Sequence, residues 1–164
     1  MLLLVSSATM AEDLKTDASL DRCLDKASTT LAMNQCYAAA TRAWDQEMNA
    51  QYNSLMTRLS GEEKTTLRRA QRAWLSYRDS WLEASRSRLK TQGSLGSVAL
   101  SAQGLSLVRN QALMLQSLGK AAALIRMIAD LSGFDAGESV RPLTFRKTPW
   151  QLTPRPLFLS ASPY

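Results

Sequence analysis

Between Cys36 and Leu59 the sequence carries an apolar residue at every third or fourth position. The members of this stripe are Cys36, Ala40, Trp44, Met48, Tyr52, Leu55 and Leu59. Because an α-helix has 3.6 residues per turn, this spacing places them on one side of a long amphipathic helix. Thr29 or Thr30 can cap its start. A single helix cannot bury such a stripe alone, so the pattern predicts packing against other helices.

Two further helices are predicted on either side of it. Residues 16–28 show a three-to-four spacing of apolar residues and predict a short first helix. The stretch Ser60-Gly61-Glu62-Glu63 has the pattern of a capping box and predicts a third helix that runs to about Lys90. Its expected inward side chains are Leu67, Ala70, Trp74, Tyr77 and Trp81.

A fourth helix is predicted from beyond Gly93 and Gly96 to about Leu118. Its apolar face comprises Val98, Leu105, Val108, Ala112 and Leu115. Residues 120–131 either extend this helix past Gly119 or form a separate short helix. All five prolines follow Ser132, so the remainder is expected to be an irregular, mobile tail. The expected domain boundaries are 12–119 for a helical domain and 120–164 for this C-terminal part.

The predicted fold class is therefore all-α: a small antiparallel helical bundle built on a long hairpin of the second and third helices. The turn between them is one or two residues near 60–61, so facing residue numbers should sum to about 121. On that register Trp74 faces Met48, Tyr77 faces Trp44, Gln71 faces Asn49 and Arg78 faces Asp45. The aromatic residues are then core, and Arg78 bridges to Asp45.

Composition argues against most catalytic and nucleic-acid-binding functions. The chain has no histidine, and its net charge of +6 is not gathered into a run of like charges. Neither a Gly-rich phosphate loop nor a Gly-x-Ser-x-Gly motif is present. We therefore expect no nucleic-acid partner, no cofactor and no metal site. A carboxylate mechanism remains as the route to catalysis, with Asp45, Glu47 and Asp79 as candidates, and we expect a non-catalytic protein.

Residues 1–11 are similar to the end of a secretory signal peptide. The apolar run Leu2–Val5 precedes small residues, and Ser6-x-Ala8 or Thr9-x-Ala11 offers a cleavage site. This predicts a periplasmic or secreted protein; the alternative is a frayed cytosolic N-terminus. No later stretch reaches about 18 consecutive apolar residues, so we expect no membrane span.

Cys23 and Cys36 are the two cysteines of the chain, and each lies on the apolar stripe of its own predicted helix. A disulfide between them would join the first two helices and contribute about 3 kcal/mol for a closed loop of this size. Export favours oxidation. The alternative is a pair of buried free thiols.

Five motifs in order resemble a known family. They are Cys23-Leu24-Asp25, Met33-Asn34-Gln35-Cys36, the run Trp44–Tyr52, Gln71-Arg72-Ala73-Trp74 and Tyr77-Arg78-Asp79. Over about residues 20–110 the chain resembles the LprI-type lysozyme inhibitor N-terminal domain family. The resemblance implies a helical, exported bacterial protein. Its motif residues here are Trp44, Asp45, Met48, Asn49, Tyr52, Gln71, Trp74, Tyr77, Arg78 and Asp79.

The chain departs from the family pattern in two respects. Many members carry a second cysteine pair, where this sequence has Leu82 and Gly104 or their neighbours, so one disulfide is expected. The proline-bearing tail is also outside the family pattern. The basic charge of the domain argues against a strongly cationic lysozyme as the target, because an inhibitor of such an enzyme usually offers an acidic patch.

The function that the sequence favours is an exported, non-catalytic binding protein, an inhibitor of lysozyme or of another cell-wall hydrolase. The alternative is an envelope interaction or structural protein, or a toxin-neutralising module, with a different protein partner. Trp81, near the end of the third helix, is the candidate partner-binding residue. The sequence does not set the oligomeric state.

Overall fold

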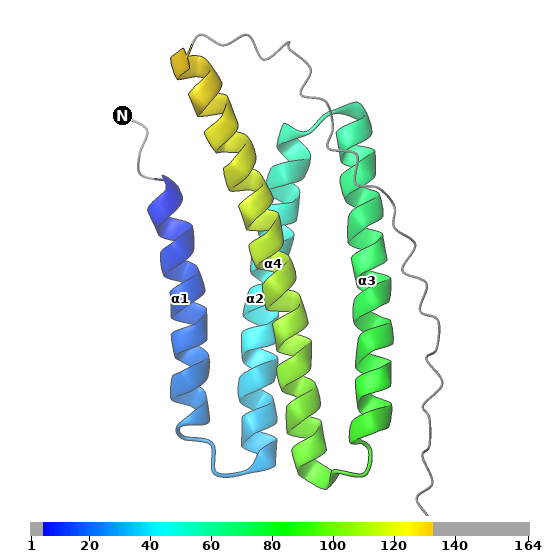
Figure 1. Cartoon of the computed structure of the whole chain (residues 1–164). Helices are drawn as coiled ribbons and strands as arrows, with labels where there is room; N and C mark the ends of the chain where they lie inside the picture. Colours follow the sequence, from blue (N-terminus) through cyan, green and yellow to red (C-terminus); the bar gives the residue numbers. More distant parts are fainter. Residues whose placement is uncertain (1–4, 133–164) are drawn as a thin grey trace, which may run out of the picture.

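Four α-helices follow one another in an up-down-up-down bundle (Figure 1). The structure, a computed structural model, describes residues 5–132, with side chains from Lys15 to Leu131. The helices are α1 (Val5–Leu24), α2 (Thr30–Arg58), α3 (Gly61–Leu89) and α4 (Gly93–Ser132). Within this range there is no strand, and the all-α prediction is confirmed. The expected tail lies, from residue 133 onward, outside the described residues.

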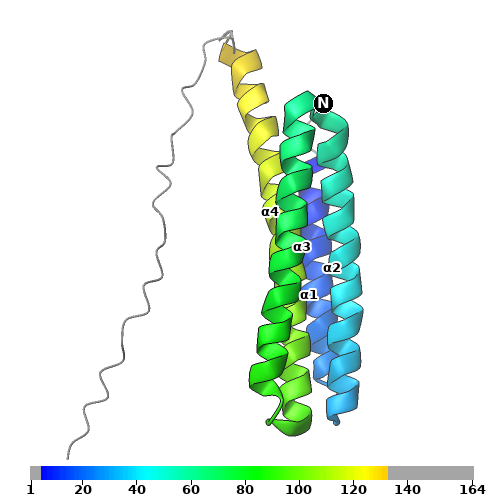
Figure 2. The same cartoon turned by 90° about the vertical axis from the view of Figure 1, so that its right-hand side faces the viewer.

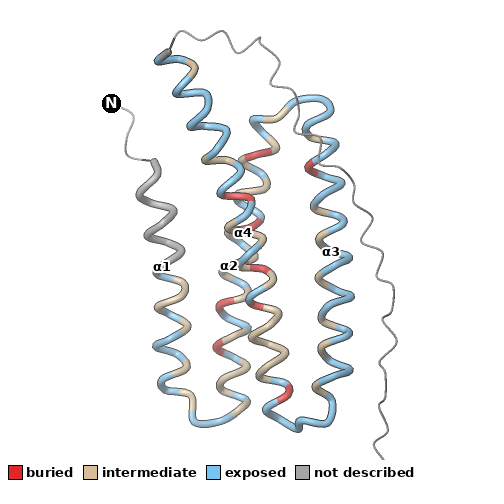
Figure 3. The backbone as a smooth tube through the Cα atoms, in the orientation of Figure 1, coloured by how far each residue is buried: buried red, intermediate tan, exposed pale blue. Residues whose placement is uncertain are grey.

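The two central helices are α2 and α4, which pack against each other along most of their length. α1 packs on α2, and α3 packs on α4, so the outer helices flank the central pair (Figures 1 and 2). The core is built mainly from these two stripes: Ala40, Trp44, Met48, Leu55, Leu67, Leu105, Val108, Ala112 and Leu115. Figure 3 shows that most buried residues lie on α2 and α4. The apolar stripes predicted for these two helices are therefore confirmed.

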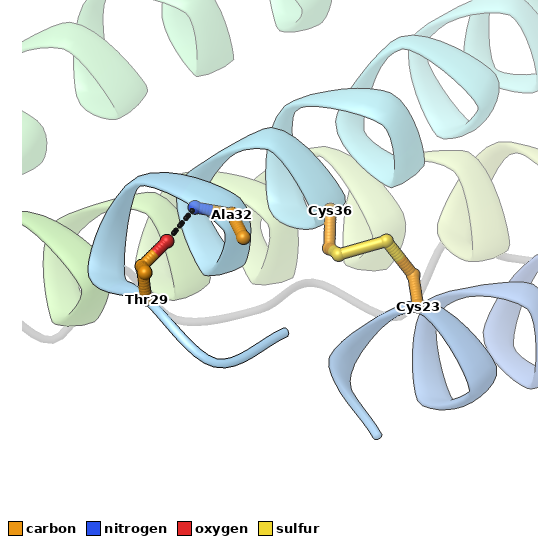
Figure 4. The surroundings of a disulfide bond; sticks show 4 residues. All are labelled: Cys23, Thr29, Ala32 and Cys36. Atoms are coloured by element: carbon orange, nitrogen blue, oxygen red, sulfur yellow. Dashed lines mark hydrogen bonds between the residues drawn. A yellow bond between two sulfur atoms is a disulfide. The ribbon is translucent and has the colours of Figure 1, made fainter. Parts of the chain in front are cut away.

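Local chemistry explains where the helices begin. The Thr29 hydroxyl accepts a hydrogen bond from the amide of Ala32 at 3.1 Å, which caps α2 (Figure 4). At the next turn, the Glu63 carboxylate accepts from the amide of Ser60 at 3.2 Å, as the capping-box pattern predicts. Both cap predictions are confirmed.

Two glycines shape the turn from α3 into α4. Gly93 has a φ of +58°, which L side chains rarely adopt. At Gly96 a Cβ atom would lie 2.5 Å from the backbone oxygen of Leu89, so a side chain there would collide with the end of α3. These residues let α4 start close to the helix that precedes it.

One helix boundary differs from the prediction, and the structure decides between the two alternatives for residues 120–131. α1 begins at Val5 rather than near residue 16, and α4 continues without a break to Ser132. The second of the two alternatives for residues 120–131, a separate helix, is therefore wrong. Gly119 does not interrupt the helix; a Cβ at that position would lie 3.6 Å from Leu55 Cδ2, so the glycine packs against α2.

One helix of the described part, α4, is long and apolar enough by length and composition to cross a membrane. Within Gly93–Leu131, a stretch of 18 residues has a mean hydropathy of 1.3, and 17% of that stretch is buried in the structure. No uninterrupted apolar stretch marks this helix in the sequence, because glutamines and scattered charges break the run. In this structure the first part of α4 belongs to the bundle, and its end extends past the α2–α3 turn (Figures 1 and 2).

Candidate functional site

The disulfide predicted between the two cysteines is present and joins α1 to α2 (Figure 4). The Cα atoms of Cys23 and Cys36 are 5.7 Å apart. Cys36 is buried on the stripe of α2, whereas Cys23 is exposed at the end of α1. The bridge therefore fixes one end of the bundle, and the alternative of two buried free thiols is wrong.

A polar network ties three helices together at the middle of the bundle. The Arg109 guanidinium on α4 forms an ion pair with Asp17 on α1, with Nη2 2.7 Å from Oδ2. Asp17 also accepts a hydrogen bond at 3.2 Å from the indole N–H of Trp44. Trp44 is only 1% exposed. The Arg109 guanidinium lies over the Trp44 ring, 5.2 Å from its centroid. This arrangement gives the buried indole N–H a hydrogen-bond acceptor and orients α1 on the central helices α2 and α4.

The third helix is held mainly through polar contacts. Gln71 accepts a hydrogen bond from Gln111 on α4 at 2.9 Å and reaches the sulfur of Met48 on α2 at 3.7 Å. Further along, Ser85 donates to Gln103 at 2.6 Å. Close backbone packing of α3 is against α4 and not against α2. The two helices of the predicted hairpin are consequently antiparallel neighbours with space between them.

This separation changes some of the contacts expected from the register between α2 and α3. Gln71 contacts Met48, the neighbour of the predicted Asn49, and Trp74 is partly buried and packs against the core. The expected inward stripe of α3 is correct for Leu67 and wrong for Ala70, Tyr77 and Trp81, which are exposed. The physical reason is that α4 occupies the position that a simple hairpin would give to α2.

The predicted Arg78–Asp45 ion pair is wrong. The Arg78 guanidinium instead pairs with its neighbour Asp79, with Nη2 2.7 Å from Oδ1, and lies over the Trp74 ring. One oxygen of the Asp45 carboxylate accepts a hydrogen bond at 3.2 Å from Asn49, one turn further along α2. Both charges are thus satisfied within their own helices.

Arg78 and Asp45 nevertheless face the same hollow, which we call the α2–α3 groove. Its lining residues are Thr41, Arg42, Asp45, Gln46, Arg78, Asp79, Leu82, Gly104 and Val108. α2 and α3 form its walls and α4 its floor, and its volume is about 460 Å³. A Cβ at Gly104 would lie 3.9 Å from Leu82, so the glycine keeps the floor of the groove low.

The groove is charge-balanced and suited to recognition. Two arginines, Arg42 and Arg78, stand against two aspartates, Asp45 and Asp79. Within the described part of the chain, the side chains of Arg42 and Gln46 form no hydrogen bond or ion pair, so they are available to a ligand. Within the same described range, no group of three histidine, cysteine, aspartate or glutamate side chains could hold a metal ion.

A separate aromatic pair lies on another face of α3. The rings of Tyr77 and Trp81 are 6.2 Å apart, and the two residues are 54% and 50% exposed. Neither residue lines the α2–α3 groove, although Trp81 lies one turn from Arg78 and about 60° from it around the helix. The aromatic pair is therefore a surface distinct from the groove.

Sequence reasoning missed several groove residues and the central ion pair. A polar strip lies on α2 beside the apolar stripe and comprises Thr41, Arg42 and Gln46. Their sequence spacing, with polar residues three and two positions before Trp44 and two positions after it, is the signal that could have revealed the strip. Asp17 and Arg109 are separated by 92 residues, and no local pattern connects them.

Comparison with protein families finds a match to the family described as lysozyme inhibitor LprI over residues 23–118. The chain belongs to the LprI lysozyme inhibitor family. The matched range contains both cysteines of the disulfide and every residue that lines the α2–α3 groove. It ends at Leu118, so the last part of α4 lies beyond the LprI match. No curated protein and no solved structure matches the chain.

Proposed function

We propose that this chain is an exported, non-catalytic LprI protein that inhibits a lysozyme or another cell-wall hydrolase. The observation that carries the proposal is the family match, which spans the groove completely. The disulfide is consistent with an oxidising compartment, and residues 1–11 have the pattern of a signal peptide.

The α2–α3 groove is the proposed docking site for the hydrolase. Asp45, Arg78 and Asp79 belong to the family motifs, yet none of them is part of the buried core. Helix packing therefore does not account for their presence. Arginine side chains beside a concave surface are frequent anchors of protein interfaces.

The dimensions of the groove suit a protruding segment of the target. A stable interface buries about 800 Å² on each partner, so the groove would form its centre and the exposed walls of α2 and α3 its rim. Because the two arginines are balanced by two aspartates, the groove would recognise a segment that carries both donors and acceptors, and not simply a cationic surface.

The test is inhibition of lysis of a peptidoglycan suspension by the oxidised chain, with several lysozymes of different net charge. We expect inhibition of at least one enzyme, and a loss of about tenfold or more in potency for the double variant Asp45→Ala and Arg78→Ala. The matched control is Asp21→Ala with Arg69→Ala, which removes the same charges from exposed positions outside the groove. Equal potency of the groove variant, or no inhibition at large molar excess, would contradict the proposal.

A second candidate is a binding module for a different envelope protein or a toxin. It is favoured by the exposed pair Tyr77 and Trp81, which lies outside the groove and has the composition of a protein-binding surface. Affinity capture from periplasmic extract distinguishes the two functions. Recovery of a hydrolase that the groove variant fails to capture supports the first, whereas a different partner lost on Trp81→Ala supports the second.

A further inference from the structure

The last three turns of α4, residues 120–131, form a segment that we call the distal segment. It extends past the α2–α3 turn, beyond the end of the bundle (Figures 1 and 2). It also lies outside the LprI match, which ends at Leu118. The distal segment therefore lies beyond the part of the chain that the family model matches.

Large apolar side chains are exposed along the distal segment. Leu124 and Met127 are each about half exposed, Ile125 is 68% exposed and Leu131 is 80% exposed. Leu124, Met127 and Leu131 follow the spacing i, i+3 and i+7, which gathers them on one helical face. Arg126 falls on the far side of the helix, about 130° from the centre of this face, whereas Asp130 lies at its edge, about 60° from Met127. The distal segment is thus a helix with an exposed apolar face, and Figure 3 shows that most of its residues are exposed.

On α2, α3 and α4, the described side chains at the end of the bundle that carries this helix are mainly basic. The cations there are Arg58, Lys64, Arg68, Arg69, Lys120 and Arg126. They outnumber the carboxylates of Glu62, Glu63 and Asp130. Arg58 and Arg126 line a common hollow of about 160 Å³ together with Glu63, which places the end of α2 beside the distal segment.

This charge decides between the possible occupants of the apolar face. A second copy of the chain docked end to end would bring two basic surfaces together, and their repulsion would oppose the contact. A bilayer with anionic headgroups offers the opposite charge and an apolar interior in the same place. In addition, α4 has the mean hydropathy of a helix that can enter a bilayer.

We propose that the distal segment is an interfacial anchor, which lies on the surface of an anionic phospholipid bilayer. Leu124, Met127 and Leu131 enter the boundary between headgroups and acyl chains, while Lys120 and Arg126 contact the phosphates. The α2–α3 groove lies further down the bundle and is left open. This inference is independent of the hydrolase-inhibitor proposal.

The test is co-sedimentation of the full, oxidised chain with vesicles of phosphatidylcholine alone or mixed with phosphatidylglycerol. We expect preferential binding to the phosphatidylglycerol vesicles that weakens as salt is raised. The variant Leu124→Gln with Leu131→Gln should bind at least about tenfold more weakly, because two apolar side chains no longer enter the bilayer. Glutamine keeps helix propensity, and circular dichroism verifies that the helix content is unchanged.

The matched control is Leu31→Gln with Leu95→Gln. These leucines are 69% and 68% exposed, but they lie at the starts of α2 and α4, at the opposite end of the bundle (Figure 1). This variant should bind vesicles as strongly as the unmodified chain. A similar loss in both variants would contradict a site at the distal segment.

Another variant separates the distal segment from the N-terminal apolar run. Leu2→Gln with Leu4→Gln should leave vesicle binding unchanged; if it abolishes binding while the distal variant does not, the proposal is wrong. The proposal is also overturned if the full chain does not bind anionic vesicles. Equilibrium sedimentation that finds a dimer, lost on changing Leu124 and Leu131, would in that case assign the face to a second copy.

Discussion

Asp17 and Arg109 form a two-pronged ion pair beside the buried Trp44. The Arg109 Nε lies 3.1 Å and its Nη2 2.7 Å from Oδ2 of Asp17. The other carboxylate oxygen of Asp17 accepts a hydrogen bond from Trp44 Nε1 at 3.2 Å. One carboxylate on α1 thus meets a group from each of the two central helices, and it sets the position of α1 on the bundle.

We expect Asp17→Ala to destabilise the fold by about 1–3 kcal/mol. Both side chains of the ion pair are about one-third exposed, so the pair alone contributes little to the free energy of unfolding. The variant also leaves the buried indole N–H of Trp44 without its acceptor, and this is the larger cost. Urea unfolding followed by circular dichroism measures the loss. Asp17→Asn should restore part of it, since the amide oxygen can still accept from the indole. Asp21→Ala, at an exposed position one turn further along, serves as the control and should have little effect.

The three tryptophans Trp44, Trp74 and Trp81 should differ sharply in their effect on stability. Trp44→Ala should cost about 3–5 kcal/mol, the range for deleting a buried large aromatic residue, and can prevent folding. Trp74→Ala should cost less, because that ring is only partly buried, and Trp81→Ala should change stability by about 0.5 kcal/mol or less. Thermal or urea unfolding of the three variants gives the order. An equal loss for Trp44→Ala and Trp81→Ala would contradict the described core.

Local chemistry made most of the fold predictable. The Thr29 cap, the Ser60–Glu63 capping box and the apolar stripes of α2 and α4 depend on residues within a few turns of one another. The disulfide was predictable for a related reason, since each cysteine lies on the apolar stripe of its own helix. Interactions of short sequence range leave a pattern that can be read without coordinates.

The groove could not be predicted because it depends on how α3 is rotated about α4. The aromatic spacing of Trp74, Tyr77 and Trp81 suggested an inward stripe, but polar contacts such as Gln71 with Gln111 turn a different face inward. Because α4 stands beside α2, α3 packs mainly on α4, and the register between α2 and α3 alone does not determine its contacts. The ion pair of Asp17 with Arg109 could not be predicted for the same reason. It depends on tertiary packing that brings together two residues 92 positions apart in the sequence.

Removal of the disulfide should lower the stability of the bundle by about 3 kcal/mol. The bridge closes a loop of 14 residues, counting both cysteines. The value of about 3 kcal/mol follows from the conformational entropy that the unfolded chain gains when this loop is opened. For a domain of this size the melting midpoint of Cys23→Ser with Cys36→Ser should fall by roughly 10 °C. Thiol titration of the denatured, unreduced chain should find no free thiol. Two free thiols would show that the bridge is not formed.

A double-mutant cycle on Asp45 and Arg78 tests whether the α2–α3 groove is a recognition surface and not a part of the scaffold. Arg78 pairs with Asp79 and Asp45 with Asn49, so the coupling energy between Asp45 and Arg78 should be indistinguishable from zero. Each single alanine variant should lose about 1 kcal/mol or less in unfolding free energy, as is usual for a solvent-accessible pair. A coupling of 2 kcal/mol or more would mean that the two side chains form a bridge across the groove. In that case the groove would be closed in solution, and a hydrolase could not dock there without breaking an ion pair.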